Sequence, residues 1–451
     1  MFIFLYFCNS KTDENMLLRL IIKNFLSFYE ETVFDMFPNP KRNSFPNHIY
    51  SDMQIPLLKQ AAIYGANGSG KSNFIKAAWF IKSFVTIDDF LSKVDLPDYR
   101  FQLVSNDNLK IRFEIEFYHK ERYFIYSFEI EKKTINESLK ISGLKNSDDK
   151  LIFERNGNSI ISDHLQNESA AKHLLSLNPY TPILLLNSKY PILSSADVKR
   201  AFDWFNNTLD VITNNSTIPA LIKLMSKEPK ILSFTNEIFE NIGIGINKVK
   251  VEETPFDKFF SDTRYSKKIE DLMQKESVTP KTGILGVENK KNVFNISFEK
   301  GEKKVQELLF DQTGIDGFRK GMKITAQSDG TFRLLTLIPA LFSVKNEPKV
   351  IFIDEIDNSI HTLLMVNLIK FFSKLETKGQ LIYTTHDPEL LNQQEVLRPD
   401  EVWFTEKDKG TTRMYSLNEF KLHHTINIQN GYLAGRYGGI PFFGNISLLN
   451  D

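Results

Sequence analysis

One eight-residue segment carries the clearest chemistry in the sequence. Gly65–Ser72 reads GANGSGKS and matches the phosphate-loop pattern G-x-x-x-x-G-K-[ST] at every fixed position. Its glycines let the backbone wrap a polyphosphate, and a helix that follows adds the positive end of its dipole. Lys71 is expected to reach the β and γ phosphates of ATP, and the Ser72 hydroxyl to hold Mg²⁺. The residues predicted to bind the nucleotide are Gly65, Asn67, Gly68, Ser69, Gly70, Lys71 and Ser72.

A pair of carboxylates follows an apolar segment in the second half of the chain. Residues 350–353 read VIFI and are followed by Asp354 and Glu355. An uninterrupted apolar run is typical of a central strand that is covered on both faces. Asp354 is expected to orient the Mg²⁺ shell, and Glu355 to polarise the water that attacks the γ phosphate. Such a strand occurs often by chance, but together with the phosphate loop it predicts ATP hydrolysis.

Two further segments are candidates for contact with the nucleotide. His386 follows the apolar residues 381–383, in a strand expected to lie beside the strand at 350–353, and is predicted to reach the γ phosphate. Ser328 and Gly330 precede a helix and offer a hydroxyl and N–H groups to an anion. The plainer interpretations are a structural histidine and an ordinary capped helix.

The elements around the phosphate loop fit its proposed role. Residues 61–64 read as a strand that enters the loop, and apolar positions recur at helical spacing from 74 to 85. Strands are predicted at 18–22 and 32–34, joined by a corner that contains Phe25 and Phe28. Those rings either contact the nucleotide base or pack in the turn, and general burial preference favours packing.

The predicted fold class is α/β, with a phosphate-loop core sheet, an antiparallel β subdomain and a compact, mainly helical insertion. Alternating apolar residues from about 100 to 163 predict the antiparallel sheet and exclude a simple succession of βα units. Helices are expected at 198–205, 218–225 and 231–242, and a mobile polar excursion at 266–291. The expected divisions are an extension outside the fold at 1–15, an amino-terminal ATPase lobe at 16–163, the helical insertion at 164–290 and a carboxyl-terminal ATPase lobe at 291–451.

Composition narrows the class of protein. The 451 residues are 41% hydrophobic and 25% charged, with 56 basic and 56 acidic side chains, so no global basic field demands nucleic acid. The single cysteine, Cys8, excludes an internal disulfide framework and suits a reducing cytoplasm. No run of about 18 apolar residues predicts a membrane span.

With these elements in this order, the chain resembles the ABC-type ATPases of the SMC, Rad50 and RecF class. It is most similar to their OLD-like branch from bacterial anti-phage operons, with the PARIS and Septu ATPases and RloA-type proteins. Gly65–Ser72 matches that group's G-x-N-G-x-G-K-S loop, and Leu18–Phe28 resembles its opening strand and corner. Ser328–Arg333 stands at the signature position, although Asp329 and Thr331 depart from its usual S-G-G-Q.

The resemblance implies that ATP is held between two copies of the chain, so that hydrolysis depends on assembly. It places His361 in the D-loop, makes His386 the switch histidine and offers Gln102 as a Q-loop ligand of Mg²⁺ beside Ser72 and Asp354. Gly435–Gly438 also resembles that branch, with no role attached. The residues implied to act within one copy are Lys71, Ser72, Asp354, Glu355 and His386. Those implied to act on the neighbour's nucleotide are Ser328, Gly330 and His361.

The function expected from this resemblance is that of an ATP-gated sensor in anti-phage defence. It would hold a separate effector encoded nearby, a Toprim or HNH nuclease, and respond to a phage-derived trigger. About 65 residues follow His386, too few for an appended Toprim domain, so no intrinsic nuclease is expected. The alternative is a DNA-repair or recombination ATPase that clamps duplex DNA, which the balanced charge and the lack of long heptad repeats disfavour. A nucleotide-binding scaffold without turnover is disfavoured by Glu355.

Overall fold

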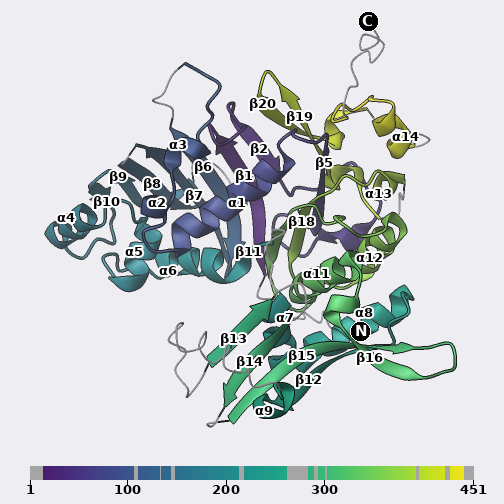
Figure 1. Ribbon diagram of the computed structural model, residues 1–451. Coiled ribbons are helices and arrows are strands. Elements are labelled where there is room, and N and C mark those ends of the chain that lie inside the picture. The colour runs from purple at the N-terminus through teal and green to yellow at the C-terminus, as the bar shows by residue number, and fades with distance from the viewer. Residues whose placement is uncertain are drawn as a thin grey trace, which may run out of the picture. The chain divides into compact units, whose positions relative to one another are not determined.

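The computed structural model of the chain (Figure 1) describes residues 14–105, 110–132, 134–143, 148–212, 218–261, 283–288, 293–299, 302–392, 396–421 and 427–440. The chain divides into two compact units. Unit 1 comprises Met1–Ile212, Ser343–Ile356 and Ser373–Asp451, and unit 2 comprises Thr213–Phe342 and Asp357–Phe372. The chain therefore passes between the units more than once.

Unit 1 contains the core sheet that carries the phosphate loop. Its strand order is β11 (Leu209–Ile212), β17 (Val350–Ile353), β18 (Gln380–Thr384), β5 (Gln60–Gly65), β19 (Val402–Asp408) and β20 (Thr411–Ser416). The first five strands are parallel, and β20 pairs antiparallel with β19. The apolar strand β17 lies inside the sheet, as its sequence predicts. The parallel strands place their carboxyl ends, and the residues that follow them, along one edge.

The second sheet of unit 1 is antiparallel. Its order is β10 (Ser159–Ile161), β9 (Lys150–Asn156), β8 (Thr134–Ile141), β7 (Arg122–Glu131), β6 (Ile111–His119), β1 (Asn15–Lys23) and β2 (Thr32–Asp35). Strand β6 alternates strictly between buried and half-buried residues, which is the pattern of a sheet with one face on a core. The antiparallel sheet expected at 100–163 is confirmed, and β1 and β2 extend it.

Helix α1 (Lys71–Thr86) carries aromatic side chains that contact both sheets of unit 1. The Phe84 ring stacks on Phe128 of β7 with centroids 4.4 Å apart. The Phe74 ring lies 5.8 Å from that of Phe352 on β17. Because the helix that begins at the phosphate loop is held on two faces, the direction of its amino-terminal end is fixed by the core.

The corner between β1 and β2 is a packed turn. Phe25 and Phe28 are fully buried. The Phe25 ring contacts Phe80 of α1 and Phe113 of β6, at centroid distances of 5.3 and 5.0 Å. The packing interpretation of these two rings is therefore confirmed.

The short elements of unit 1 complete its cover. They are η1 (Pro46–His48), β3 (Ile49–Tyr50), β4 (Leu57–Leu58), α2 (Phe90–Lys93), α3 (Leu96–Tyr99), α4 (Glu168–Leu177), α5 (Ile183–Lys189), α6 (Ala196–Asp203), the π-helical turn η3 (Trp204–Thr208), α13 (Glu389–Asn392), η5 (Pro399–Glu401), η6 (Leu417–Glu419) and α14 (Ile428–Leu433). Trp204 is fully buried and stacks on Phe117 of β6. This contact ties the chain after α6 to the antiparallel sheet.

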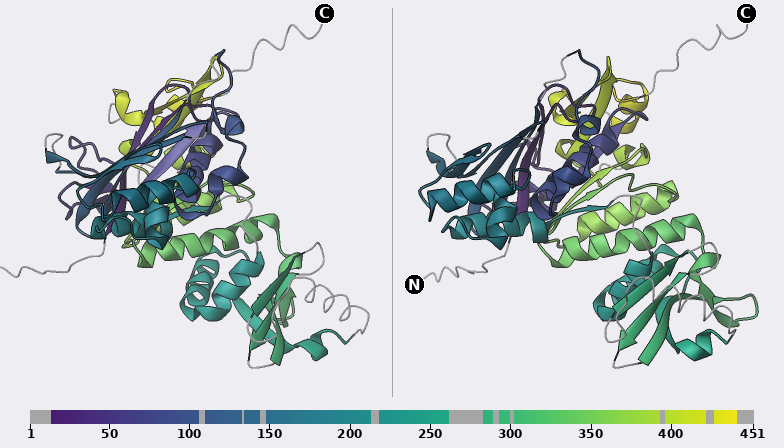
Figure 2. Two further views of the ribbon diagram at one scale, coloured as in Figure 1. Left: turned by 90° about the vertical axis from the view of Figure 1, so that its left-hand side faces the viewer. Right: turned by 60° about the vertical axis from the view of Figure 1, so that its left-hand side comes forward.

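Unit 2 combines helices with a sheet of its own. Its sheet has the order β12 (Lys248–Pro255), β15 (Glu302–Thr313), β14 (Val293–Glu299) and β13 (Gly283–Glu288), with β16 (Arg319–Lys323) also paired to β15. The helical elements are α7 (Ile218–Lys227), α8 (Pro229–Ile242), α9 (Phe256–Phe259), η4 (Ile324–Ala326) and the first parts of α11 (Asp329–Asn346) and α12 (Thr362–Lys374). Figure 2 shows α7 and α8 beside this sheet, in agreement with their contacts to β12 and β14.

The structure corrects the expected helical insertion at 164–290. Its first part, up to Ile212, belongs to unit 1, where β11 pairs with β17 in the core sheet. Its later part contains β12 and β13, so the insertion is not a single, mainly helical body. The sequence of β12 hides this, because Val249 is its only fully buried residue and the rest of the strand is polar and partly exposed. Most of the polar excursion expected at 266–291 lies outside the described residues.

The amino-terminal boundary shifts by one residue. Asn15 is the first residue of β1 and bonds the His119 imidazole through its side-chain oxygen at 2.7 Å. The first thirteen residues, which belong to the expected extension, lie outside the described residues. No helix in the described parts of the chain has the combined length and hydropathy that crossing a bilayer requires.

Candidate nucleotide site

The phosphate loop is locked in place by the hairpin β19–β20. Thr412 of β20 donates a hydrogen bond to the Ser69 carbonyl oxygen at 2.8 Å, and Thr405 of β19 bonds the Ser69 hydroxyl at 2.6 Å. Gly70 has a φ of 115°, and a Cβ there would lie 2.2 Å from the Thr412 hydroxyl oxygen. Glycine is therefore required at this position by both the backbone angle and the close approach of the hairpin.

Lys71 lies inside the loop that precedes it. Its ammonium group donates to the carbonyl oxygens of Gly65 at 2.6 Å and Ala66 at 3.0 Å, and the side chain is 5% exposed. Two carbonyls stabilise a buried ammonium group that would otherwise lack its water shell. The charge is thereby held at the mouth of the loop, beside the exposed Asn67 and Gly68.

The Ser72 hydroxyl and the Asp354 carboxylate after β17 lie side by side. The Ser72 hydroxyl donates to the Asp354 carboxylate at 3.1 Å, although 282 positions separate the two residues. The same Asp354 oxygen accepts a hydrogen bond from the Thr384 hydroxyl at 2.8 Å. Residues from α1, β17 and β18 therefore converge at one edge of the core sheet.

Glu355 occupies a strained backbone conformation beside this network. Its φ of 46° lies in the left-handed region, which a residue with a side chain adopts at a cost of about 1–3 kcal/mol. Its backbone N–H donates to the Thr384 hydroxyl at 2.7 Å. Strain of this kind is often found at functional sites, and Glu355 is the candidate catalytic carboxylate of this one.

Thr384 is a positioning residue that the sequence prediction missed. Its hydroxyl is fully buried and joins both acidic residues of the site. The available signal was its place in the LIYTTHD segment, as a hydroxyl at the end of a strand expected beside β17. The hydroxyls of Thr405 and Thr412 were missed in the same way.

We predict that Thr384→Val lowers the rate of ATP hydrolysis about tenfold and leaves ATP binding nearly unchanged. Loss of the hydroxyl leaves the Glu355 N–H without its acceptor and frees the Asp354 carboxylate, at a cost of about 1–3 kcal/mol. Steady-state ATPase rates and nucleotide binding measure the two effects. The matched control is Thr377→Val, which removes a threonine hydroxyl bonded to Tyr50 at 2.9 Å outside this network. Equal losses of rate in both variants would contradict the role of Thr384.

His386 follows the end of β18. The strand pairs with β17 on one side and β5 on the other, which confirms the neighbourhood that the sequence predicts for this histidine. The His386 side chain is exposed, and the next residue, Asp387, is buried with its N–H donated to Thr385. Contact between His386 and a γ phosphate stays a prediction.

Gln102 has a local partner in this structure. Its side chain is exposed and donates to the Pro97 carbonyl oxygen at 3.1 Å. That Gln102 is a ligand of Mg²⁺ stays a prediction. Binding of the ion would require this hydrogen bond to break.

The residues expected to act on a neighbour's nucleotide all lie in unit 2, where each has a structural role. The Ser328 hydroxyl accepts the N–H of Thr331 at 3.2 Å and so caps α11, with its side chain exposed. The His361 Nδ1 atom accepts the N–H of Leu363 at 3.3 Å at the start of α12. For Ser328, the plain interpretation of a capped helix therefore holds within one copy.

Gly330 is fixed by contact with the loop after β17. A Cβ on Gly330 would lie 2.7 Å from the Ser359 carbonyl oxygen. Ser359 itself has a φ of 61°. The start of α11 therefore packs directly on the backbone of Ser359, which lies two residues before His361 in the proposed D-loop.

The donor set at Ser72 and Asp354 fits Mg²⁺ that arrives with a nucleotide. Mg²⁺ is usually held by one or two protein oxygens together with phosphates and waters. Within the described residues no group of three or more histidine, cysteine or acidic side chains forms a metal cage. The Ser72 hydroxyl and the Asp354 carboxylate, already 3.1 Å apart, are the residues that would hold the ion.

Comparison with solved structures finds heads of SMC proteins. An SMC head bound to the C-winged helix domain of ScpA is similar over 89% of this chain and 97% of that one, at 15% identity and a TM-score of 0.45. The SMC head domain from Thermotoga maritima is similar over 90% of this chain and 100% of that one, at 14% identity and a TM-score of 0.41.

No curated protein matches the sequence. A family model described as "AAA domain, putative AbiEii toxin, Type IV TA system" matches residues 61–392, from the phosphate-loop strand through the segment after His386. This match spans the phosphate loop, both acidic residues of the site and Thr384, so the chain belongs to this family of AAA domains.

Proposed function

We propose that this protein binds ATP together with Mg²⁺ and hydrolyses it. The observation that carries the proposal is the hydrogen-bonded group of Ser72, Asp354, Thr384 and Glu355 at one edge of the core sheet. Membership of the AAA domain family supports nucleotide binding in general. The strained Glu355 favours turnover over mere binding, because a scaffold gains nothing from holding a carboxylate in a costly conformation.

The residues divide the work as follows. Lys71 exchanges its two carbonyl partners for the β and γ phosphates, and the N–H groups of the loop donate hydrogen bonds to the remaining phosphate oxygens. Ser72 and Asp354 hold the metal, and bound Mg²⁺ offsets the negative charge on the phosphate oxygens. Glu355, directed by Thr384, orients the attacking water and takes its proton. Positioning and electrostatics supply most of the catalysis in such phosphoryl transfers.

Hydrolysis, in this proposal, requires two copies of the chain to hold ATP between them. The exposed start of α11, with Ser328 and Gly330, covers the nucleotide bound in the phosphate loop of the other copy. His361 lies near the same contact, and His386 senses the γ phosphate from within the first copy. Two features support the arrangement: the α11 start faces solvent, and Gly330 packs it on the loop that follows β17.

The biological role proposed for this cycle is that of a sensor in anti-phage defence. The family description names a putative toxin, and the motifs resemble those of OLD-like defence ATPases. ATP-driven pairing would hold or release a separate effector, a nuclease of the Toprim or HNH type, when a phage-derived trigger appears. A ligand shifts such an equilibrium only by its different affinity for the two states, so the trigger must distinguish paired from unpaired copies.

Co-expression with the product of the adjacent reading frame tests this role. We expect the two proteins to co-purify, and we expect ATP to change the amount of partner retained on a tagged copy. Lys71→Ala, which cannot hold the triphosphate, should retain partner at the same level with and without ATP. Absence of any association would overturn the sensor role. Stimulation of ATPase activity by plain duplex DNA, without that partner, would favour a DNA-clamping ATPase instead.

A further inference from the structure

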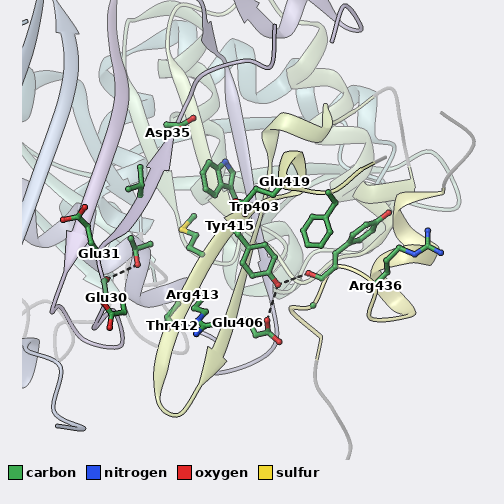
Figure 3. Close-up of a pocket in the computed structure, with 16 residues that line it drawn as sticks. Glu30, Glu31, Asp35, Trp403, Glu406, Thr412, Arg413, Tyr415, Glu419 and Arg436 are labelled. Atoms are coloured by element: carbon green, nitrogen blue, oxygen red, sulfur yellow. Dashed lines mark hydrogen bonds between the residues drawn. The ribbon is translucent and has the colours of Figure 1, made fainter. Parts of the chain in front are cut away.

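A cavity of about 790 Å³ lies in unit 1 beside the β19–β20 hairpin (Figure 3). This size falls within the range of protein sites that hold ligands. The walls come from β2 and the residues before it, from the β19–β20 hairpin, from η6 and from the segment after α14. Figure 3 labels lining residues from each of these segments, among them Glu30, Asp35, Trp403, Glu406, Glu419 and Arg436.

The lining carries an excess of negative charge. It includes five carboxylates, at Glu30, Glu31, Asp35, Glu406 and Glu419, and two guanidinium groups, at Arg413 and Arg436. The Glu31 carboxylate already pairs with Arg112, a residue outside the lining, at 3.0 Å, and the other four still outnumber the two guanidinium groups. Arg413 stands opposite Glu406 in the hairpin register. In Figure 3 the Arg436 side chain extends away from Glu406 and Tyr415. The cavity therefore attracts a cation.

Aromatic side chains form the other part of the lining. Tyr415, Phe420 and Tyr437 pack together, with ring centroids 6.0 and 5.3 Å apart along the series. Trp403 is 6% exposed, and its indole N–H has no hydrogen-bond partner among the described residues. An aromatic surface beside carboxylates is the environment that suits a guanidinium group, which stacks on rings and pairs with carboxylates.

The cavity wall is continuous with the phosphate loop. Thr412 lines the cavity and also donates to the Ser69 carbonyl oxygen at 2.8 Å. On the opposite wall, a Cβ on Gly439, next to the lining residue Gly438, would lie 3.7 Å from the Gly65 Cα atom. A movement of either wall would therefore displace one end of the phosphate loop.

We propose that this cavity is a docking site for an arginine-bearing peptide segment of a partner protein, and that docking is coupled to the phosphate loop through Thr412. The guanidinium group enters between the carboxylates and the Tyr415 ring, which is half-buried. The site is separate from the nucleotide residues and does not depend on hydrolysis. By reciprocity, a bound nucleotide changes the affinity for the peptide by the same factor as the peptide changes the affinity for the nucleotide.

Selection from a displayed library of random twelve-residue peptides, with the full-length protein as bait, tests the docking site. We expect the selected peptides to share an arginine, and a fluorescein-labelled copy to bind in an anisotropy titration. Replacing that arginine with lysine should weaken binding about fivefold or more, because an ammonium group lacks the planar fork. Selection without arginine enrichment, or of nothing, would overturn the proposal. Binding of spermidine at the same affinity would assign the cavity to polyamines instead.

Variants of the protein locate the peptide. Glu30→Gln with Glu406→Gln should weaken the labelled peptide about tenfold, because hydrogen bonds to charged groups are among the stronger ones. The matched control, Glu154→Gln with Glu376→Gln, removes two exposed carboxylates of unit 1 that do not line the cavity, and should bind normally. Both double variants should bind ATP like the unmodified protein. Equal peptide affinity in the two variants would place the peptide elsewhere.

The coupling is tested with a non-hydrolysable ATP analogue. We expect saturating analogue to change the peptide affinity about fivefold or more, to a limit that further analogue does not exceed. Thr412→Val, which cannot donate to Ser69, should still bind the peptide but with little response to the analogue. A response that grows without limit as analogue is added would show direct competition and make the cavity part of the nucleotide site. No response in the unmodified protein would refute the coupling.

Discussion

Glu355→Gln will lower the rate of ATP turnover by about 100-fold or more while leaving ATP bound, because a positioned general base contributes a factor of about 10²–10⁴. Glutamine keeps the shape of the side chain and its hydrogen-bonding reach but cannot take a proton from water. The backbone contact to Thr384 is unaffected, since it is made by the Glu355 N–H. The variant should therefore keep the structure of the site and lose only the general base.

The same variant should accumulate as a pair of copies when ATP is present. If hydrolysis is what separates the copies, then blocking it holds them together, and size-exclusion chromatography with ATP will show the shift. Glu347→Gln is the matched control, because Glu347 is exposed and precedes the amino end of β17, at the opposite end of the strand from Glu355. Unchanged turnover in Glu355→Gln would remove Glu355 from the mechanism. Lost turnover without pairing would leave an ATPase that does not act through assembly.

The sequence could predict those parts of the site whose function depends on the residues of one short segment. Gly65–Ser72 needs a fixed series of backbone angles and a lysine at its end, so its pattern is nearly sufficient. Asp354 and Glu355 follow an apolar run whose burial on both faces is a local property. Their meeting with Ser72 could be inferred because the carboxyl ends of parallel strands share one edge.

Thr384 and Thr412 escaped prediction for a physical reason. Each is a single buried hydroxyl in a strand, and a threonine there fits β structure with no further role. Their importance arises only from partners brought close by the fold: Thr412 reaches the Ser69 carbonyl across 343 positions of sequence. Nothing local distinguishes such a hydroxyl from one that merely packs.

The division of the chain into units was predicted poorly where a strand pairs with another strand that is distant in the sequence. Leu209–Ile212 is a short segment after a helical stretch, yet it becomes β11 because it lies parallel to β17, more than a hundred positions later. The sequence of β12 is mostly polar and does not resemble a strand, yet β12 pairs along its length with β15. Hairpins such as β6 and β7 were predictable because the two strands are adjacent in the sequence and each shows alternating apolar and polar residues.

A mixed pair of two inactive variants should recover ATP hydrolysis. Lys71→Ala lacks the ammonium group that holds the triphosphate, and Ser328→Arg places a long cationic side chain at the exposed start of α11, where the neighbour's nucleotide would lie. Each variant alone is expected to be inactive, with ATP binding lost only in the first. Loss of the Ser328 helix cap costs only about 1 kcal/mol, so retained ATP binding in Ser328→Arg will show that this variant still folds.

A pair with one copy of each variant contains one site damaged twice and one site with both native parts. Purified through two different tags, it should turn over ATP at about half the rate of the unmodified pair, since one of two symmetric sites is intact. Pairing Lys71→Ala with Glu355→Gln supplies the control, because both of those residues serve the nucleotide of their own copy and no intact site results. If the first mixed pair stays as inactive as the second, Ser328 does not act across the pair. If Ser328→Arg alone hydrolyses ATP normally, each copy works by itself.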